Sequence, residues 1–182
     1  MTKEGITEQV EIPSGVSVSK EGMFLIIKGP KGELRKAIKN TGLDIRAEGS
    51  TVVFASKKNT KTDVKIIFTY KALVKNWFKG VTEAHVYKLK ICSSHFPMSA
   101  SVKGEIFELK NFVGGSKPRT LKITQGVKAK VESEIITLEG IDKEAVGNFA
   151  AKLEKMTRRA AFYNLVFQDG IYITSKDGES LD

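Results

Sequence analysis

The chain has 182 residues, a length that fits one large domain or two small ones. Hydrophobic residues make up 41% of it and charged residues 28%, which excludes a disordered chain and leaves enough apolar side chains to build a core. Thirty Lys and Arg against 21 Asp and Glu give a net charge of +9. This balance favours a polyanionic partner, a nucleic acid or a membrane surface, over an enzyme with an acidic cleft.

An internal repeat organises the predicted elements in chain order. Residues 22–28 resemble residues 104–110, each an apolar strand that ends in Lys. Residues 47–54 resemble residues 131–138, each a pair of strands joined by a tight turn, and a helical stretch follows each pair. We therefore predict two homologous domains. The predicted domains are residues 1–82 and 83–182.

Alternating apolar residues and Gly-bearing turns predict strands through the rest of each copy. The turns fall at residues 29–32 and 114–118. Each copy is therefore predicted to be a small antiparallel sheet covered by one helix, a fold of the α+β class. The alternating residues are Val16 and Val18, Tyr87, Leu89 and Ile91, and Val127, Ala129 and Val131.

Two helices follow from apolar residues at helical spacing. The first is predicted from Asp63 to Phe78, with Gly80 placed as its C-terminal cap. The second is predicted from Asp142 to Arg159, with Asp142 as its N-cap. Gly147 inside the second helix indicates a close approach, either of the helix's own sheet or of an RNA backbone.

Residues for catalysis or metal binding are scarce. The chain has one cysteine, Cys92, and two histidines, His85 and His95, too few for a structural zinc site. No phosphate-binding or hydrolase motif occurs, and Asp169, followed by Gly, is interpreted as a turn former. We expect no enzyme activity, no cofactor and no metal. A single Cys allows no internal disulfide, and the chain shows neither a signal peptide nor a membrane span, so a cytosolic protein is expected.

Basic residues are more informative where acids are missing. The stretch from Lys110 to Lys130 contains no Asp or Glu, and on the second helix Lys152, Lys155 and Arg159 are spaced to share a face, with Arg158 beside them. We favour phosphate contact over an ordinary solvated face for this half. The row Lys71, Lys75 and Lys79 on the first helix fits either interpretation. The acid-free stretch holds Lys110, Lys117, Arg119, Lys122, Lys128 and Lys130.

Six short strings, taken in order, resemble the conserved motifs of the ribosomal protein L6 family of the large subunit. They match the form that these motifs take in its archaeal and eukaryotic branch. They span most of the chain, and the ordered set is specific although each string alone is weak. The strings are Ile12–Val16, Lys28–Gly32, His95–Pro97, Asn111–Gly114, Gly147–Ala151 and Gln168–Ile173.

The resemblance implies a duplicated fold and a protein without catalytic activity. It also implies binding to large-subunit ribosomal RNA, chiefly through the C-terminal domain, near the sarcin–ricin loop and the stalk base, in the cytoplasm. Neighbouring large-subunit proteins and, transiently, translation GTPases would lie close by. Carried over position by position, the expected RNA-facing residues are His95, Lys110, Asn111, Lys117, Arg119, Lys152, Lys155, Arg158, Arg159 and Tyr172.

One departure from the family and two alternatives remain. The bacterial branch carries cations before its final Ile-containing string, whereas residues 168–170 here hold none, which shifts the expected anchoring toward Lys117, Arg119, Arg158 and Arg159. The main alternative is an extra-ribosomal nucleic-acid-binding module of the same fold. An enzyme that uses Cys92 and His95 as nucleophile and base has the least support.

Overall fold

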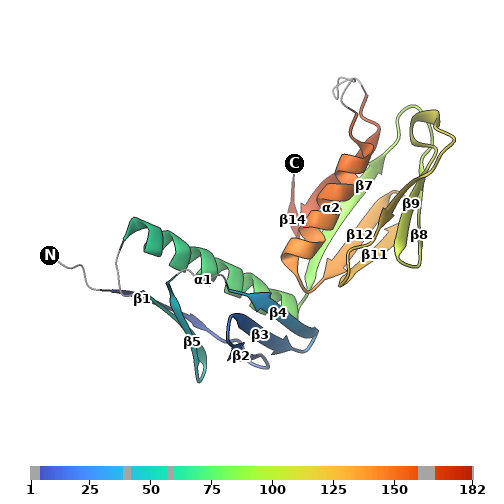
Figure 1. Ribbon diagram of the computed structural model, residues 1–182. Coiled ribbons are helices and arrows are strands. Elements are labelled where there is room, and N and C mark those ends of the chain that lie inside the picture. The colour runs from blue at the N-terminus through green and yellow to red at the C-terminus, as the bar shows by residue number, and fades with distance from the viewer. Residues whose placement is uncertain (1–4, 39–41, 57–59, 160–166, 182) are drawn as a thin grey trace. The chain divides into compact units, whose positions relative to one another are not determined.

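The computed structural model describes residues 5–38, 42–56, 60–159 and 167–181. The chain divides into two compact units, Met1–Ala84 (unit 1) and His85–Asp182 (unit 2), and the predicted cut after residue 82 lies close to this division. Each unit combines antiparallel sheets with one long helix (Figure 1), which confirms the predicted α+β class.

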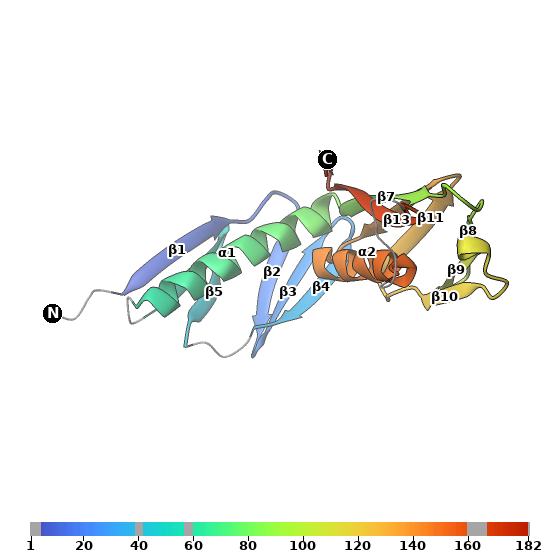
Figure 2. The same ribbon diagram turned by 90° about the horizontal axis from the view of Figure 1, so that it is seen from above.

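Unit 1 contains two three-stranded antiparallel sheets packed against one helix. Their strand orders are β1-β6-β5 and β2-β3-β4. Helix α1 packs on strands of both sheets and runs lengthwise past them (Figure 2). The elements are β1 (Ile6–Glu11), β2 (Ser17–Glu21), β3 (Phe24–Gly29), β4 (Gly32–Ala37), β5 (Asp44–Glu48), β6 (Thr51–Ser56) and α1 (Lys61–Thr82).

Unit 2 repeats this order and adds two strands at its end. Its sheets have the orders β10-β9-β8 and β11-β12-β7-β13-β14, and α2 packs on the larger sheet. Phe107, Phe149 and Leu153 are among the fully buried side chains of its core. The elements are β7 (His85–Cys92), β8 (Ser99–Lys103), β9 (Ile106–Lys110), the 3-10 turn η1 (Phe112–Gly114), β10 (Arg119–Lys122), β11 (Val127–Glu132), β12 (Ile135–Gly140), α2 (Lys143–Thr157), β13 (Gly170–Lys176) and β14 (Glu179–Ser180).

The same backbone hydrogen bond occurs at the same place in both copies. The Ile12 N–H donates to the Ser50 carbonyl at 2.8 Å, and the Ile91 N–H donates to the Glu134 carbonyl at 2.7 Å. Each bond extends the pairing of a first strand, β1 or β7, with the second strand of the following hairpin, β6 or β12. The repeat seen in the sequence is therefore a repeat of strand pairing, in which β1 corresponds to β7.

Helix α1 is longer than predicted at both ends. Thr60 and Asp63 form a reciprocal capping box at its start. At its other end the helix runs past Gly80 to Thr82, so the predicted glycine cap is wrong. The helical burial pattern continues through the fully buried Val81, and this packing outweighs the low helix propensity of glycine.

Helix α2 begins as predicted and ends earlier. The Asp142 side chain accepts from the Glu144 N–H at 3.1 Å and caps the helix. The helix ends at Thr157, and Arg158 has extended backbone angles. The predicted helical row that included Arg159 is therefore wrong, since Arg158 and Arg159 follow the helix while Lys152 and Lys155 lie on it.

Gly147 lies against its own sheet, as one of the two sequence interpretations had it. A Cβ built at this position would be 3.7 Å from Tyr87 Cε2 of β7, an ordinary van der Waals contact. At Gly140, in contrast, a Cβ would be 2.7 Å from Val146 Cγ2 and 2.9 Å from the Gly126 carbonyl oxygen. The first glycine has room for a methyl group and the second does not.

We therefore expect opposite effects from two glycine substitutions. Gly147→Ala should raise the free energy of unfolding by about 0.5–1 kcal/mol, because alanine favours the helix and meets no clash. Gly140→Ala should lower it by about 1–3 kcal/mol through overpacking. Urea unfolding of both variants beside the wild type measures this, and a loss of stability in Gly147→Ala would contradict the assignment of its surroundings.

Candidate nucleic-acid interface

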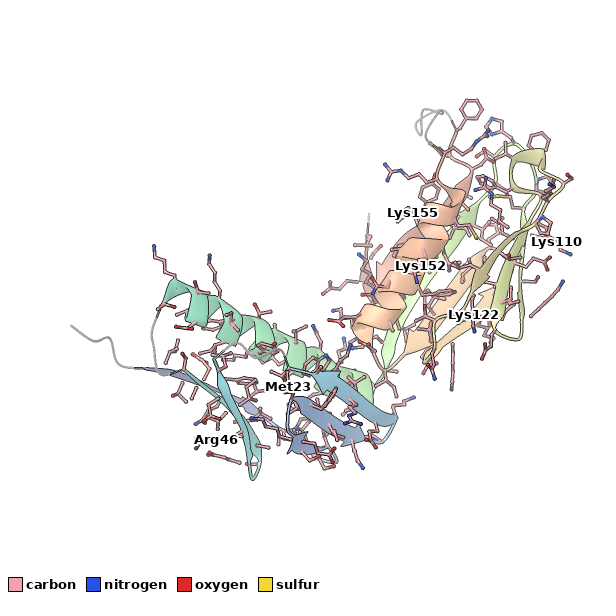
Figure 3. The ribbon with its side chains drawn as sticks, in the orientation of Figure 1. Met23, Arg46, Lys110, Lys122, Lys152 and Lys155 are labelled. Carbon is pink, nitrogen blue, oxygen red and sulfur yellow. The ribbon has the colours of Figure 1, made fainter. Side chains whose placement is uncertain are left out.

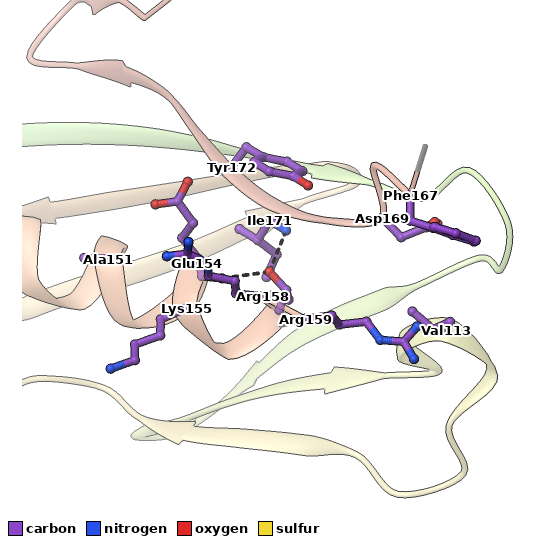
Figure 4. A pocket seen from close by; sticks show the side chains of 11 residues that line it. Val113, Ala151, Glu154, Lys155, Arg158, Arg159, Phe167, Asp169, Ile171 and Tyr172 are labelled. Atoms are coloured by element: carbon purple, nitrogen blue, oxygen red, sulfur yellow. Dashed lines mark hydrogen bonds between the residues drawn. The ribbon is translucent and has the colours of Figure 1, made fainter. Parts of the chain in front are cut away.

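Four segments of unit 2 meet where α2 ends. They are the β7–β8 connection, the turn after β9, the last turn of α2, and the stretch that leads into β13. The Ile171 N–H donates to Thr157 Oγ1 at 3.0 Å, and the same hydroxyl donates to the Glu154 carbonyl at 3.0 Å, which ties β13 to the helix (Figure 4). Of the residues predicted to face RNA, His95, Asn111 and Lys155 lie on these segments and Arg158 and Arg159 directly follow α2, while the others lie on adjacent strands, in the loop before β10 or one turn earlier on α2.

The buried carboxylate of Asp169 fastens the β7–β8 connection. Its Oδ1 accepts from the backbone N–H groups of Ser94 and His95 at 2.7 and 3.0 Å, and its Oδ2 accepts from His95 Nδ1 at 2.5 Å. Burial alone would raise the pKa of this carboxyl, but the hydrogen bonds from His95 and Ser94 outweigh it and hold the pKa below its ordinary value. Asp169 was interpreted from sequence as a turn former, so its role as an anchor is a correction.

His95 is thereby oriented at the surface. Its ring packs against the Phe167 ring at a tilt of 32°, with the ring centroids 5.1 Å apart, and its side chain stays 43% exposed. No sequence signal joined His95 to Asp169, because the two lie more than seventy residues apart in the chain and meet only through the pairing of β7 with β13.

The turn after β9 has an unusual backbone. Asn111 and Val113 both have left-handed backbone angles, with φ of 57° and 52°. For a β-branched residue such as Val113 this conformation costs about 1–3 kcal/mol, so the surrounding contacts must hold it. Asn111 Nδ2 donates to the Pro97 carbonyl at 2.9 Å, and Gly114 lies against the Phe96 ring. The turn and the β7–β8 connection therefore support each other.

Arg119 is engaged within the protein. Its guanidinium carbon lies 4.2 Å from the centroid of the buried Phe112 ring, and its Nη1 donates to the Met156 carbonyl at the end of α2. This carbonyl is one of those that a helix C-terminus leaves without an intrahelical partner. Lys117, in contrast, is exposed in the loop before β10.

Arg119 and Lys117 should accordingly respond differently to truncation. Arg119→Ala should lower the free energy of unfolding by about 2 kcal/mol, since it removes a charged hydrogen bond and a cation–π contact. Lys117→Ala should leave stability within about 0.5 kcal/mol of the wild type. Urea unfolding separates the two variants, and equal stability of both would contradict the structural tie at Arg119.

A hollow of about 490 Å³ opens beside the end of α2. Four of the predicted residues, Lys155, Arg158, Arg159 and Tyr172, line it together with Phe167, and their side chains surround the space in Figure 4. Burial raises the pKa of the Tyr172 phenol, so this group remains a neutral hydrogen-bonding partner at physiological pH. The remaining lining residues are Val113, Ala151, Glu154, Thr157, Asp169 and Ile171.

The cations at this end have few acidic neighbours. Lys152, Lys155 and Arg158 are exposed, and none of them forms an ion pair with a residue that the structure describes. Lys152 and Lys155 project from α2, while Lys110, at the end of β9, projects from the smaller sheet (Figure 3). Such cations suit phosphate groups, which supply the missing negative charge.

Part of the stretch without acids in the sequence is neutralised in space. Lys130 pairs with Glu132 at 2.5 Å along β11, and Lys122 pairs with Glu105 at 3.5 Å across the smaller sheet. Lys128 stands opposite Glu139 in the pairing of β11 with β12. The expectation of a one-sign patch from Lys110 to Lys130 is therefore wrong in its second half. Glu132 follows Lys130 on the same strand, and strand pairing places acids beside Lys122 and Lys128.

The lysine row on α1 is also partly compensated. Lys71 Nζ lies 2.6 Å from Glu8 Oε2 of β1, whereas Lys75 has no ion pair with a described residue. The acid partner lies more than sixty residues away in sequence, so the helix pattern alone could not reveal it.

The described residues are not arranged for the catalytic pair of Cys92 and His95 or for metal binding. The His95 ring pairs with Asp169 rather than with Cys92. His85 is fully buried, with its Nδ1 2.8 Å from Asp177 Oδ2. Over residues 5–38, 42–56, 60–159 and 167–181, no group of three or more potential metal ligands gathers. Neither helix in this part of the chain is long and apolar enough to cross a membrane.

Comparison with known proteins assigns the chain to a family. The model of the family described as ribosomal protein L6 matches residues 12–84 and residues 96–161, one segment in each unit. The chain belongs to the ribosomal protein L6 family. The resemblance in the six short strings is thereby confirmed, and so is the duplication that it implied.

Three archaeal relatives cover nearly the whole chain, and each is named large ribosomal subunit protein uL6. The protein of Methanospirillum hungatei is 41% identical over 92% of this chain and 95% of its own length. That of Methanococcus vannielii is 38% identical over 97% of both chains. That of Sulfurisphaera tokodaii is 39% identical over 93% of this chain and 92% of its own. These relatives fit the predicted branch, and the L6 family is structural rather than enzymatic, as the sequence predicted.

Proposed function

We propose that this L6 family member is a structural protein of the large ribosomal subunit that binds large-subunit ribosomal RNA mainly through unit 2. The observation that carries the proposal is that exposed Lys155 and Arg158 line the hollow at the end of α2, with exposed Lys152 one turn earlier on the same helix. The names of the archaeal relatives support the ribosomal assignment. The cytoplasm, as the place of the ribosome, follows from the same proposal.

The binding mechanism is phosphate contact on a fixed frame. Lysine and arginine neutralise phosphates and release counterions, which gives affinity without reading base sequence. Folded RNA is recognised chiefly by shape, so the cations must be held in a set arrangement. Here the Asp169 anchor, the Asn111 bond to Pro97 and the Arg119 tie hold the segments around them.

The predicted residues divide between direct contact and support. We infer that Lys110, Lys117, Lys152, Lys155, Arg158 and Arg159 contact phosphates, and that Tyr172 and the exposed edge of His95 donate hydrogen bonds to RNA. Asn111 and Arg119 hold the two ends of the loop that carries Lys117. The resemblance to the family adds the finer location, near the sarcin–ricin loop and the stalk base, where the protein would brace RNA beneath the site of translation GTPases.

Sedimentation and crosslinking test this proposal. The full chain, tagged and made in its own host, should sediment with large subunits through a wash at moderate salt. Ultraviolet crosslinks from residues 152–159 should then map to large-subunit RNA. A chain that stays at the top of the gradient, or that crosslinks to other nucleic acids alone, would contradict the proposal and favour an extra-ribosomal module.

A further inference from the structure

The outer edge of β1 in unit 1 lacks the strand that covers the corresponding edge in unit 2. Strand β1 is the last strand of the sheet β1-β6-β5, whereas its counterpart β7 lies between β12 and β13. No strand in the described part of unit 1 pairs with that outer edge. The strand position next to β7 is therefore occupied by β13 in unit 2, whereas the equivalent position next to β1 is unoccupied in the described part of unit 1.

The backbone groups of this edge can be assigned by their alternation. Because the Ile12 N–H bonds across to β6, the residues two apart from it along β1 also face β6, and the intervening residues face outward. The outward residues are Thr7, Gln9 and Glu11. All three have exposed side chains, and their backbone N–H and carbonyl groups line an unpaired edge.

The counterparts in unit 2 show how such an edge is used. In β7 the residues that correspond to Thr7 and Gln9 are Val86 and Lys88, as the matching bonds of Ile12 and Ile91 establish. The Val86 carbonyl accepts from the Asp177 N–H at 2.8 Å, and the Lys88 carbonyl accepts from Thr174 Oγ1 at 3.1 Å. The same β13 segment places Ile171, which is fully buried, beneath α2.

Unit 1 has a hollow at the corresponding place, between β1 and α1. Its volume is about 480 Å³. Val10, Pro13 and Phe78 give it an apolar floor, and Lys71 and Lys75 give it a cationic rim. Lys71 forms an ion pair with Glu8, so Lys75 is the cation of this rim that is available to pair with an acidic side chain of a partner. Gln9 and Glu11 complete the lining.

We propose that the outer edge of β1 binds an extended segment of another protein, which adds to the sheet as a strand. The segment would pair its backbone with Thr7, Gln9 and Glu11, place an apolar side chain over Val10 and Phe78, and set an acidic side chain against Lys75. Strand addition of this kind takes its affinity from main-chain hydrogen bonds and its specificity from the side-chain pockets.

Photo-crosslinking with a backbone control tests the proposal on the full chain in its own host. The crosslinker is p-benzoylphenylalanine in place of Gln9. Glu11→Pro, added to this chain, removes an outward N–H and leaves the ladder to β6 intact. Ala47→Pro is the matched control, since Ala47 faces outward on β5, the other edge of the same sheet.

We expect crosslinks to one protein, confined to one extended segment that carries an acidic residue. Glu11→Pro should reduce their yield about tenfold or more, and Ala47→Pro should leave it unchanged. Crosslinks to RNA alone, to a second copy of this chain or to no partner would overturn the inference, as would a yield that Glu11→Pro does not change. Sedimentation of the same chains shows separately whether they enter the large subunit, so failure here is distinguishable from failure of the proposed ribosomal role.

Discussion

Asp169→Ala should lower the free energy of unfolding by about 3 kcal/mol, because it leaves the N–H groups of Ser94 and His95 without their charged acceptor. Asp169→Asn should cost less, since its amide oxygen can still accept from those two groups. Urea unfolding measures both variants. Glu134→Ala, which removes an exposed carboxylate from a β-turn, is the control and should stay within about 0.5 kcal/mol of the wild type.

The Asp169 anchor also has a pH signature. Its pKa in the folded chain is below its ordinary value of 3.8, so the folded state holds its proton less tightly than the unfolded state. The stabilisation is therefore complete above pH 3.8 and is lost as the pH falls through the lower folded pKa. The difference in stability between wild type and Asp169→Ala should be constant from neutral pH down to this range and then shrink. A difference that grows with acidification would contradict the anchor.

Removing three exposed cations should weaken RNA binding by about two orders of magnitude. The variant combines Lys152→Gln, Lys155→Gln and Arg158→Gln, and each lost phosphate contact costs about five- to eightfold in affinity at about 0.1 M salt. The three side chains are exposed, so the free energy of unfolding should change little. Equilibrium binding of the full chain to large-subunit ribosomal RNA at fixed salt measures the loss.

A second triple variant supplies the matched control. Lys122→Gln, Lys128→Gln and Lys130→Gln remove the same charge from the same unit. Two of these lysines pair with carboxylates, and Lys128 stands opposite Glu139. Their loss should weaken binding by less than about threefold, through the long-range field alone. Equal losses in the two triple variants would mean that net charge, rather than the end of α2, governs binding.

The repeat and the element types could be predicted from sequence because they follow local patterns. The match of residues 22–28 to 104–110 locates β3 and β9, the central strands of the sheets β2-β3-β4 and β10-β9-β8. The alternation of apolar and polar residues located β7 and β11, and Asp142 could be recognised from the sequence as the N-cap of α2. In each case the signal lies within a few residues of the element that it describes.

The helix ends were harder because packing decided them. Glycine is the commonest residue after a helix, which made Gly80 a reasonable cap. Burial of Val81 carries the helix one turn further, and a propensity of about 1 kcal/mol cannot oppose it. The end of α2 at Thr157 likewise depends on a distant contact, the bond from the Ile171 N–H.

The sequence supplied the candidate cations of this surface but not the contacts that hold them in place. Sequence could identify cations without acidic neighbours along the chain. Glu132 is a local neighbour of Lys130 on β11, but the sequence could not show that Glu105 neutralises Lys122, because the pairing of β9 with β10 brings these two residues together. Nor could it assign Asp169 as the anchor of His95. The residues that hold this surface in place come from segments far apart in the sequence, whereas its exposed charged residues can be identified from short stretches of the sequence.

The salt dependence of RNA binding tests the central claim most directly. Affinity of the full chain for large-subunit ribosomal RNA is measured from about 50 to 200 mM salt for the wild type, the α2 triple variant and the control triple variant. The account predicts a linear fall of log affinity with log salt, with a slope about 2 to 3 smaller in magnitude for the α2 variant and unchanged for the control. A slope that is the same in all three chains would contradict phosphate binding at the end of α2.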